Sequence, residues 1–340
     1  MAEGNNVVRR SRTSLKEALD RKGLRWLRLT LMVLSVVLAG RKASPDAEVR
    51  AALDRTGLRW MLAWLLERSL AMQARGIDKV LYTSGAWFHR FHEVYVHVET
   101  PGASLPTPTQ LDEQTRDTWE HHYTPKPGDV VIDAGAGTGT EVLRWSRLVG
   151  ETGRVLAIEA NPRTFSVLSR FCELNNLTNV ELHSVALSDT SGTVSIEEHA
   201  DHRAASTVTG KGTTTVTGTT LDQLLAQVSV RNVDFMKMNI EGAEVSALLG
   251  MTGAAQGIHN LCVSCHDFRA DRGHGETFRT RATVVQALDR LGFHFEPQSP
   301  DPRPWMRDQV NARRSGSDAI ETSNHGYPYD RTGLPAQRTR

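Results

Sequence analysis

The chain has 340 residues and a formal net charge of +1, with 40 Lys and Arg residues against 39 Asp and Glu residues. This balance gives no global reason to expect a nucleic-acid partner. Hydrophobic residues make up 39% of the chain, which is enough for a packed core. Three cysteines are too few for a disulfide framework, and we expect Cys262 and Cys265 to be buried structural thiols rather than a metal or redox pair.

Residues 1–78 are predicted to form a helical N-terminal extension. The first 28 residues hold eight basic and three acidic side chains, a local excess of +5, and an apolar run of eleven residues follows at 29–39. That run is shorter than the ~20 residues of a membrane-spanning helix. Three interpretations stay open: a helix buried against the domain, a helix on a membrane surface, and a signal or anchor segment.

A sequence repeat lies within this extension. Residues 18–26 return almost unchanged 34 positions later as residues 52–60, and each copy precedes an apolar helical run. The repeat indicates either a duplicated helical hairpin or a pair of Trp- and Arg-bearing helices on an anionic membrane surface. We expect the protein to be cytoplasmic. On the second interpretation, it also associates peripherally with a membrane through its N-terminal helices.

Residues 79–120 are predicted to be a strand pair and a linker. Gly85 divides the aromatic and β-branched segment 79–99 into two strands. Prolines between residues 101 and 108 indicate a linker, and a short helix is expected at 112–122.

Residues 129–139 are the most informative stretch of the chain. A β-branched run predicts a buried parallel strand, and glycine then stands at every other position, 135, 137 and 139. Glycine lets the backbone turn sharply and approach a ligand closely, because no Cβ intervenes. The helix predicted at 140–149 directs its unpaired N–H groups toward the same crevice. Together these features predict a nucleotide-binding corner.

The spacing of the glycines indicates which nucleotide binds. A dinucleotide loop, G-x-G-x-x-G, needs glycine at position 140, where this chain has Thr140. The observed G-x-G-x-G, preceded by Asp133, resembles the S-adenosylmethionine loop of Rossmann-like methyltransferases. Glu159, at the end of the next predicted strand, is placed to accept hydrogen bonds from both ribose hydroxyls. An acidic residue at this distance also fits NAD, so Glu159 alone does not discriminate.

Strands and helices alternate through residues 121–314, which predicts a doubly wound, mostly parallel sheet of the Rossmann-like α/β class. Two extra strands are expected in a Thr- and Gly-rich insertion, and an antiparallel pair is expected to close the sheet near residue 313. Residues 315–340 are polar and without periodicity, and we expect them to be disordered.

Five motifs in order resemble the FkbM family of methyltransferases: V-I-D-A-G-A-G at 131–137, I-E-A-N-P at 158–162, V-A-L-S-D at 185–189, T-L-D at 220–222 and K-M-N-I-E-G-A-E at 237–244. The resemblance covers about residues 120–314. It implies a class I methyltransferase fold and S-adenosylmethionine-dependent O-methylation of a hydroxyl on a sugar, glycolipid or natural product. The chain departs from the family at Asn239, where Asp is usual, and its first 120 residues lie outside the resemblance.

Polar residues follow the ends of the predicted strands, where open α/β sheets bind their ligands. Asn239 and His266 are the candidate catalytic residues, with His266 as the general base because imidazole titrates near neutral pH. No metal is expected, because Asn239 removes a negative ligand. The candidate cofactor-binding residues are Asp133, Gly135, Gly137, Gly139, Glu159, Ala186 and Asn239.

Two alternatives compete with this site. Asn239 caps the following helix in one of them, while Glu241 and Glu244 neutralise that helix's N-terminal dipole. The other alternative concerns the whole protein, which would be a nucleoside-binding, membrane-associated scaffold without methyl transfer.

Overall fold

The computed structural model describes residues 59–67, 75–99, 106–198, 206–208, 214–296 and 301–314. The chain divides into two compact units, Met1–Leu105 and Pro106–Arg340. The basic N-terminal segment, the apolar run at 29–39, most of the repeat and the tail predicted to be disordered lie outside the described residues, so the predicted membrane contact stays a prediction. Within the described ranges, no helix is long and apolar enough to cross a membrane.

The first unit contains a helix and a three-stranded antiparallel sheet in the order β1–β2–β3. Leu62 and Leu66 of the helix are buried, and Glu67 Oε1 accepts a hydrogen bond from the N–H of Val80 in the first strand. These elements are α4 (Arg59–Glu67), β1 (Ile77–Thr83), β2 (Ala86–Phe91) and β3 (Val94–Val98).

Residues 79–99 therefore lie in three strands, not in the two that were predicted. The first turn, Ser84-Gly85, has φ angles of 50° and 74°, as a two-residue hairpin requires. A second turn follows at His92, whose φ is 56°. The sequence does not indicate this turn, because neither glycine nor proline marks it.

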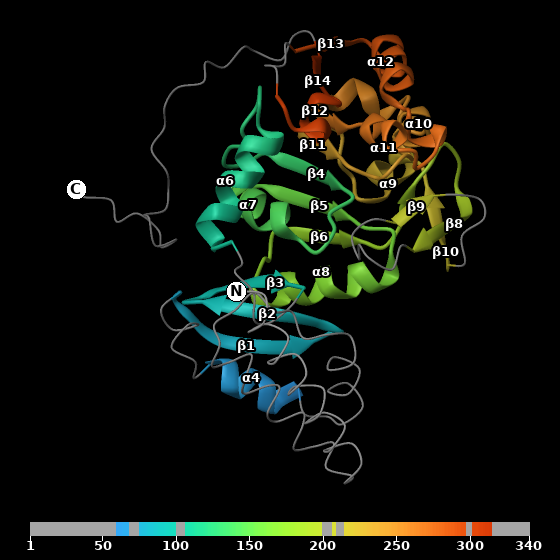
Figure 1. The fold of residues 1–340 in the computed structure, drawn as a ribbon. Coiled ribbons are helices and arrows are strands. Elements are labelled where there is room, and N and C mark those ends of the chain that lie inside the picture. Colours follow the sequence, from blue (N-terminus) through green and yellow to red (C-terminus); the bar gives the residue numbers. More distant parts are fainter. Residues whose placement is uncertain are drawn as a thin grey trace. The chain divides into compact units, whose positions relative to one another are not determined.

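A seven-stranded sheet in the order β13–β14–β12–β11–β4–β5–β6 forms the centre of the second unit (Figure 1). Neighbouring strands from β12 to β6 are parallel, whereas β14 is antiparallel to both of its neighbours. The predicted doubly wound sheet and its closing antiparallel pair are confirmed. The strands are β4 (Val130–Ala134), β5 (Arg154–Ile158), β6 (Val180–His183), β11 (Val233–Met238), β12 (Ile258–Ser264), β13 (Phe293–Phe295) and β14 (Gln309–Arg314).

Strand order reverses between β4 and β11, because the chain continues from β4 to β5 on one side and reaches β11 later on the other. In open α/β sheets the ligand crevice lies outside the carboxyl ends of the strands at such a reversal. The topology thus places the glycine loop, which follows β4, at the expected crevice.

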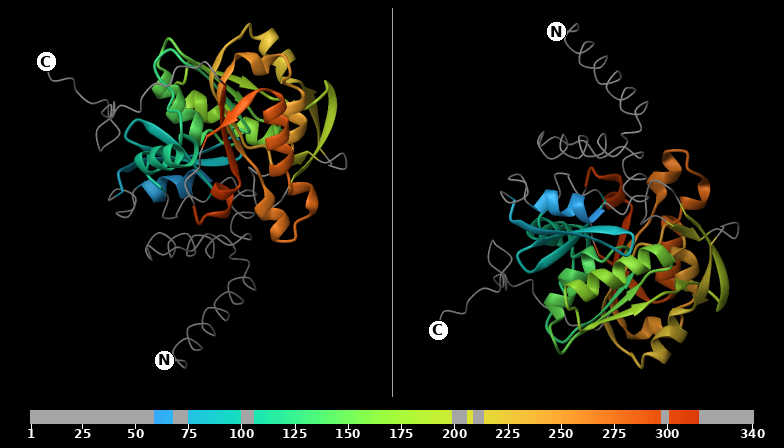
Figure 2. Two further views of the ribbon diagram at one scale, coloured as in Figure 1. Left: turned by 90° about the horizontal axis from the view of Figure 1, so that it is seen from above. Right: turned by 90° about the horizontal axis from the view of Figure 1, so that it is seen from below.

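The two faces of this sheet differ in polarity, and helices lie on both sides of it (Figure 2). Successive strand residues point to opposite faces. Met236 belongs to an apolar core shared with α9 (Leu221–Gln227), α10 (Glu244–Leu249) and α12 (Arg281–Arg290). On the other face Lys237 lies in register with Asp133, so this face carries charge inside the fold.

The insertion before α9 forms a second sheet in the order β7–β10–β8–β9. The two extra strands predicted there are confirmed as β8 and β10. The other two were not predicted, because strands of two or three residues show too little periodicity. The bounds are β7 (Ala186–Leu187), β8 (Gly192–Glu198), β9 (Ser206–Val208) and β10 (Thr214–Thr219).

A buried ion pair joins α6 (Pro108–Trp119) to α7 (Thr140–Val149), the helix after the glycine loop. Arg144 Nε and Nη2 donate to the two carboxylate oxygens of Glu120 at 2.6 and 2.7 Å. Asp112 accepts a third hydrogen bond from Arg144 at 2.6 Å. The helix predicted near residues 112–122 is therefore part of the second unit.

Replacing Glu120 by Gln should destabilise the domain, because Arg144 is only 6% exposed and loses its main counter-charge. We expect a loss of about 3 kcal/mol, at the low end for a broken buried pair because Asp112 remains. Urea denaturation measures it. Glu173→Gln breaks the more exposed pair with Arg170 and should change stability by less than about 1 kcal/mol; equal losses in both variants would contradict the assignment.

Candidate functional site

A buried ion pair positions the glycine loop. Lys237 Nζ lies 2.8 Å from Asp133 Oδ1 and donates a hydrogen bond of 2.8 Å to the carbonyl oxygen of Gly135. Burial opposes the charge on the ammonium group, but the Asp133 carboxylate raises the pKa of Lys237. The ammonium also lies 5.1 Å from the centre of the Trp119 ring. Lys237 was missed as a site residue, although it begins the most specific motif of the sequence.

The three loop glycines all have positive φ angles, but they serve different purposes. A Cβ on Gly135 would lie 2.0 Å from the carbonyl oxygen of Asn239, so this glycine lets the loop cross the end of β11. A Cβ on Gly139 would lie 2.6 Å from Phe171 of α8 (Pro162–Leu174), which indicates a packing role for this glycine; its predicted cofactor contact stays a prediction. Beside Gly137, no heavy atom of the described residues, apart from its two chain neighbours, lies within 4 Å of the added Cβ.

Glu159 follows β5 and is 7% exposed. Its Oε2 accepts the N–H of Gly137 at 3.0 Å, and its Oε1 accepts the N–H of Asn161 at 2.8 Å. Burial raises the pKa of Glu159 to about 7, against the opposing effect of these two N–H groups. The carboxylate predicted to contact a ribose therefore also shapes the glycine loop.

An open cleft of about 490 Å³ lies at the carboxyl ends of β4, β5 and β11. Four of the predicted cofactor-binding residues line it: Gly135, Glu159, Ala186 and Asn239. Asp133 is completely buried behind the loop. Asn239 Oδ1 is buried and has no hydrogen-bond partner in the described part of the chain.

Two carboxylates enclose the ring of His266. Its Nδ1 lies 3.0 Å from Glu244 Oε1, and its Nε2 lies 3.5 Å from Glu241 Oε1. The side chains of His266 and Glu244 are buried, whereas Glu241 is 19% exposed and lines the cleft. Arg269 places Nη1 2.5 Å from Glu241 Oε2. Glu241 lines the cleft, whereas His266 lies behind Glu241 and does not line it.

This enclosure does not fit the general-base role predicted for His266. Burial alone would lower the pKa of His266, but the neighbouring carboxylates of Glu241 and Glu244 raise it to about 10. At pH 7 the ring is a cation and has no lone pair to accept a proton. The prediction relied on the ordinary pKa of imidazole, because the sequence does not show that two carboxylates from the preceding βα unit surround the ring.

The backbone of the E-G-A-E segment brings both carboxylates to this ring. Glu241 and Gly242 have φ angles of 54° and 101°, and a left-handed conformation costs a residue other than glycine about 1–2 kcal/mol. Gly242 N–H donates to Glu244 Oε1 at 3.1 Å. Because α10 begins at Glu244 with Ala243 as its N-cap, Asn239 does not cap this helix, which corrects that part of the alternative. Glu244 does lie in the first turn of α10, as the same alternative predicted.

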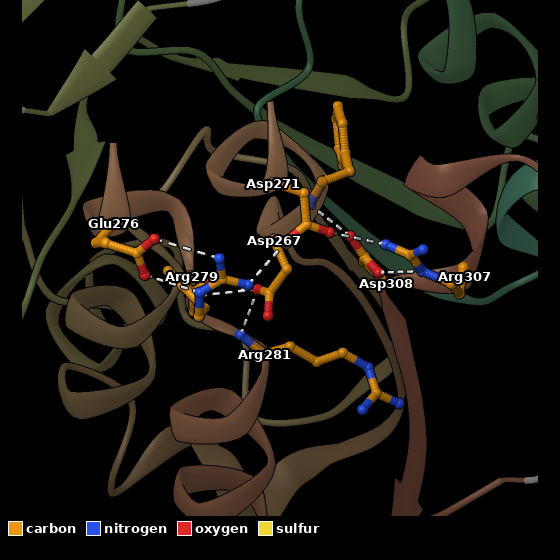
Figure 3. Close-up of polar contacts among 9 residues, drawn as sticks. Asp267, Asp271, Glu276, Arg279, Arg281, Arg307 and Asp308 are labelled. Atoms are coloured by element: carbon orange, nitrogen blue, oxygen red, sulfur yellow. Dashed lines mark hydrogen bonds and ion pairs between the residues drawn. The ribbon is translucent and has the colours of Figure 1, made fainter. Parts of the chain in front are cut away.

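Two aspartates anchor the segment that follows His266 (Figure 3). Asp267 Oδ1 accepts the N–H groups of Thr280 and Arg281, both at 2.9 Å. Asp308 Oδ2, from the turn before β14, accepts the N–H of Phe268 at 2.7 Å. Helix α11 (Asp267–Asp271), which carries Arg269, is thereby placed beside the cleft. No sequence signal identified Arg269 or Asp308.

Substituting Ala at Gly135 and at Gly137 should have different effects. The Gly135 Cβ would overlap the Asn239 carbonyl, so the loop or the end of β11 must move, and we expect a loss of more than about 3 kcal/mol. Gly137→Ala meets no neighbour and should lose only the ~1–2 kcal/mol of a left-handed alanine. Thermal and urea denaturation measure both, and a Gly135→Ala variant as stable as Gly137→Ala would contradict the close crossing.

The charge of His266 should make stability depend on pH. Its folded-state pKa lies above the ordinary 6.5, so the ion pairs contribute stability that is complete below pH 6.5 and is lost as pH rises toward about 10. Urea denaturation of the wild type should show this fall, and His266→Gln should not. His274→Gln, at an exposed position, is the control; parallel pH profiles for wild type and His266→Gln would mean that the ring is uncharged.

Part of the chain is similar to known methyltransferases. Residues 133–295 match the family model of the methyltransferase FkbM domain. The hexuronic acid methyltransferase AglP of Haloferax volcanii is 29% identical over 143 residues, 41% of this chain and 56% of that protein. Methyltransferase 1 of Beauveria bassiana is 25% identical over 209 residues, 54% of this chain and 80% of that protein.

Among solved structures, the methyltransferase FkbM of Methylobacillus flagellatus is similar with a TM-score of 0.40 and 17% identity, over 61% of this chain and 50% of that one. The fibrillarin of Aeropyrum pernix has a TM-score of 0.38 and 12% identity, over 69% of this chain and 99% of that one. This chain thus spans about half the length of AglP and of the M. flagellatus protein. The matched family model, the order of the motifs and the sheet topology together identify residues 133–295 as a methyltransferase domain of the FkbM family.

Proposed function

We propose that the protein transfers a methyl group from S-adenosylmethionine to a hydroxyl of a sugar, glycolipid or natural product. The cleft at the reversal of strand order carries the proposal: Glu159 and the glycine loop border one part of it, and the carboxylate of Glu241 borders another. A sugar acceptor is supported by the similarity to AglP, which is named a hexuronic acid methyltransferase.

The residues that line the cleft fit this cofactor. Each carboxylate oxygen of Glu159 retains a lone pair for a ribose hydroxyl, and the space beside Gly137 admits a ligand close to the backbone. Asn239 Oδ1 offers a buried acceptor that the described chain leaves without a partner. When bound, the cofactor supplies an electrophilic methyl group whose bond to sulfur breaks as its bond to the acceptor oxygen forms.

Glu241 is the residue that we assign to the acceptor. A hydrogen bond from the acceptor hydroxyl to Glu241 Oε1 would orient an oxygen lone pair toward the methyl group. Burial opposes ionisation, but His266 and Arg269 lower the pKa of Glu241, so it is a weak base. That weakness is tolerable, because an oxygen that is gaining a methyl group becomes far more acidic than a carboxylic acid. The acceptor proton therefore passes to Glu241.

His266 takes a positioning role in this proposal. Together with Arg269 it neutralises Glu241 and Glu244, which allows two carboxylates to remain ionised beside a buried ring. Asn239 is the other predicted catalytic residue, and we assign it to ligand binding, because an amide does not accept a proton at neutral pH.

Methyl-labelled S-adenosylmethionine tests the function directly. We expect label in a sugar methyl ether after incubation with neutral methyl glycosides, glucuronate or a glycolipid extract. Glu241→Gln should lower turnover by about 10²-fold or more, while calorimetry should show cofactor affinity within about threefold of wild type. If the cofactor binds but no fraction of a cell extract becomes labelled, the nucleoside-binding scaffold is the better description.

Glu159 should make cofactor affinity depend on pH. Ribose hydroxyls donate to the ionised carboxylate, so binding lowers the pKa from about 7 and releases a proton. Affinity should therefore rise between pH 6 and pH 8 in the wild type. Glu159→Gln should abolish that rise and weaken binding by about 1.5–3 kcal/mol at pH 8. Calorimetry in buffers of different ionisation enthalpy detects the proton; tight NAD binding, or an affinity independent of pH, would contradict the assignment.

A further inference from the structure

Charge is unevenly divided along the chain. Residues 1–75 hold 15 basic and 7 acidic side chains, a net charge of +8. Residues 76–340 hold 25 basic and 32 acidic side chains, a net charge of −7. The formal charge of +1 for the whole chain therefore conceals two parts of opposite sign. An anionic surface attracts the first part and repels the second, so it favours contact with the N-terminal part.

Helix α4, which lies within this positive part, exposes two tryptophans. Trp60 and Trp64 are 69% and 49% exposed. Because they are four residues apart, they lie on one side of the helix, the tryptophan face. Leu62 and Leu66 are each 3% exposed and mark the buried side of a helix that packs against β1 (Figure 1). The tryptophan face is therefore not the side that α4 uses to join the sheet.

The charged side chains of α4 are engaged with β1. Arg59 and Glu67 are the only charged residues of this helix. The guanidinium carbon of Arg59 lies 3.8 Å from the centre of the Tyr82 ring, and the Glu67 carboxylate accepts the N–H of Val80. Since both charges are held at the first strand, the tryptophan face carries no charge from its own helix.

An uncharged face with two indole rings, within a basic segment, has the composition of a helix that lies on a membrane surface. Indole rings favour the boundary between headgroups and acyl chains, because the ring is apolar and its N–H stays hydrated. Lys and Arg are attracted to anionic headgroups over about one Debye length, ~8 Å at physiological salt. The sequence repeat supplies this pairing twice, since Arg25-Trp26 recurs as Arg59-Trp60.

A nucleic acid would be attracted by the same charge, and its bases stack on aromatic rings. The apolar run at residues 29–39 favours lipid over nucleic acid, because it adds eleven residues without a charged group to the basic segment. Such a run gains free energy by leaving water for acyl chains, whereas a phosphate backbone offers it no apolar surface.

We propose that residues 1–75 dock the protein peripherally on an anionic lipid bilayer, with Trp60 and Trp64 inserted among the headgroups. The positive charge brings the chain to the surface, and the indole rings hold it there. This docking is independent of the proposed methyl transfer, because vesicle binding is measured without cofactor or acceptor.

Flotation of the full chain with lipid vesicles tests the docking. We expect wild type to float with vesicles that contain phosphatidylglycerol and not with vesicles of phosphatidylcholine alone. Added salt should weaken binding, because it screens the attraction. The double variant Trp60→Ala, Trp64→Ala should have a partition coefficient lower by about tenfold or more. Its melting temperature should equal that of wild type, because both side chains are exposed.

Trp305→Ala is the matched control. Trp305 is 45% exposed on the short helix α13 (Pro304–Arg307) of the second unit. This variant should keep a partition coefficient within about threefold of wild type, because α13 lies in the part of the chain with net negative charge. Brominated lipid in the anionic vesicles gives a second readout, since it quenches indole rings that reach the acyl chains. Quenching should persist in Trp305→Ala and fall in the double variant.

Five results would overturn the docking. Two of them are wild type that does not float with anionic vesicles at low salt, and equal partition of wild type and the double variant. A lower melting temperature in the double variant would mean that the two rings pack against another part of the chain. A change in its oligomeric state, measured by light scattering, would make the tryptophan face a contact between copies. Binding of single-stranded RNA that is lost in the double variant, without vesicle binding by wild type, would assign the surface to nucleic acid.

Discussion

The ion pair between Lys237 and Asp133 is the interaction on which the site depends. It joins β11 to β4 across the reversal of strand order, and the same ammonium group binds the first carbonyl of the glycine loop. Removal of either partner would leave a charge inside the protein without compensation, which is far more costly than an apolar pair in the same place. The glycine loop therefore has its conformation because a lysine 102 residues later in the chain lies beneath it.

A second set of charges holds the carboxylate of Glu241 at the cleft. Glu241, Glu244, His266 and Arg269 come from two consecutive strand ends, and each group compensates the charge of its neighbours. The left-handed backbone at Glu241 is the conformational cost of placing two carboxylates around one ring. In this arrangement the histidine is a cation held between two carboxylates, and we propose that it positions Glu241 rather than acting as the base that its sequence position suggests.

Both sets of charges lie at the carboxyl-terminal edge of the central sheet. The two faces of this sheet differ in polarity. The face toward α9, α10 and α12 is an apolar core and supplies stability. The opposite face carries the ion pair, the free thiol of Cys262 and two buried amides of β14 that have no hydrogen-bond partner among the described residues. The two charges persist on this buried face because each compensates the other.

Local patterns in the sequence determined the sheet, its strands and the nucleotide loop, since glycine spacing, β-branched runs and alternating βα units depend on near neighbours along the chain. Family membership followed from motif order for the same reason. Tertiary structure alone decided the roles of single residues. Gly139 packs against α8 and His266 is enclosed by carboxylates, and each of these facts depends on residues that only the folded sheet brings together. A pKa or an unsatisfied hydrogen bond belongs to an environment, and that environment is not local in sequence.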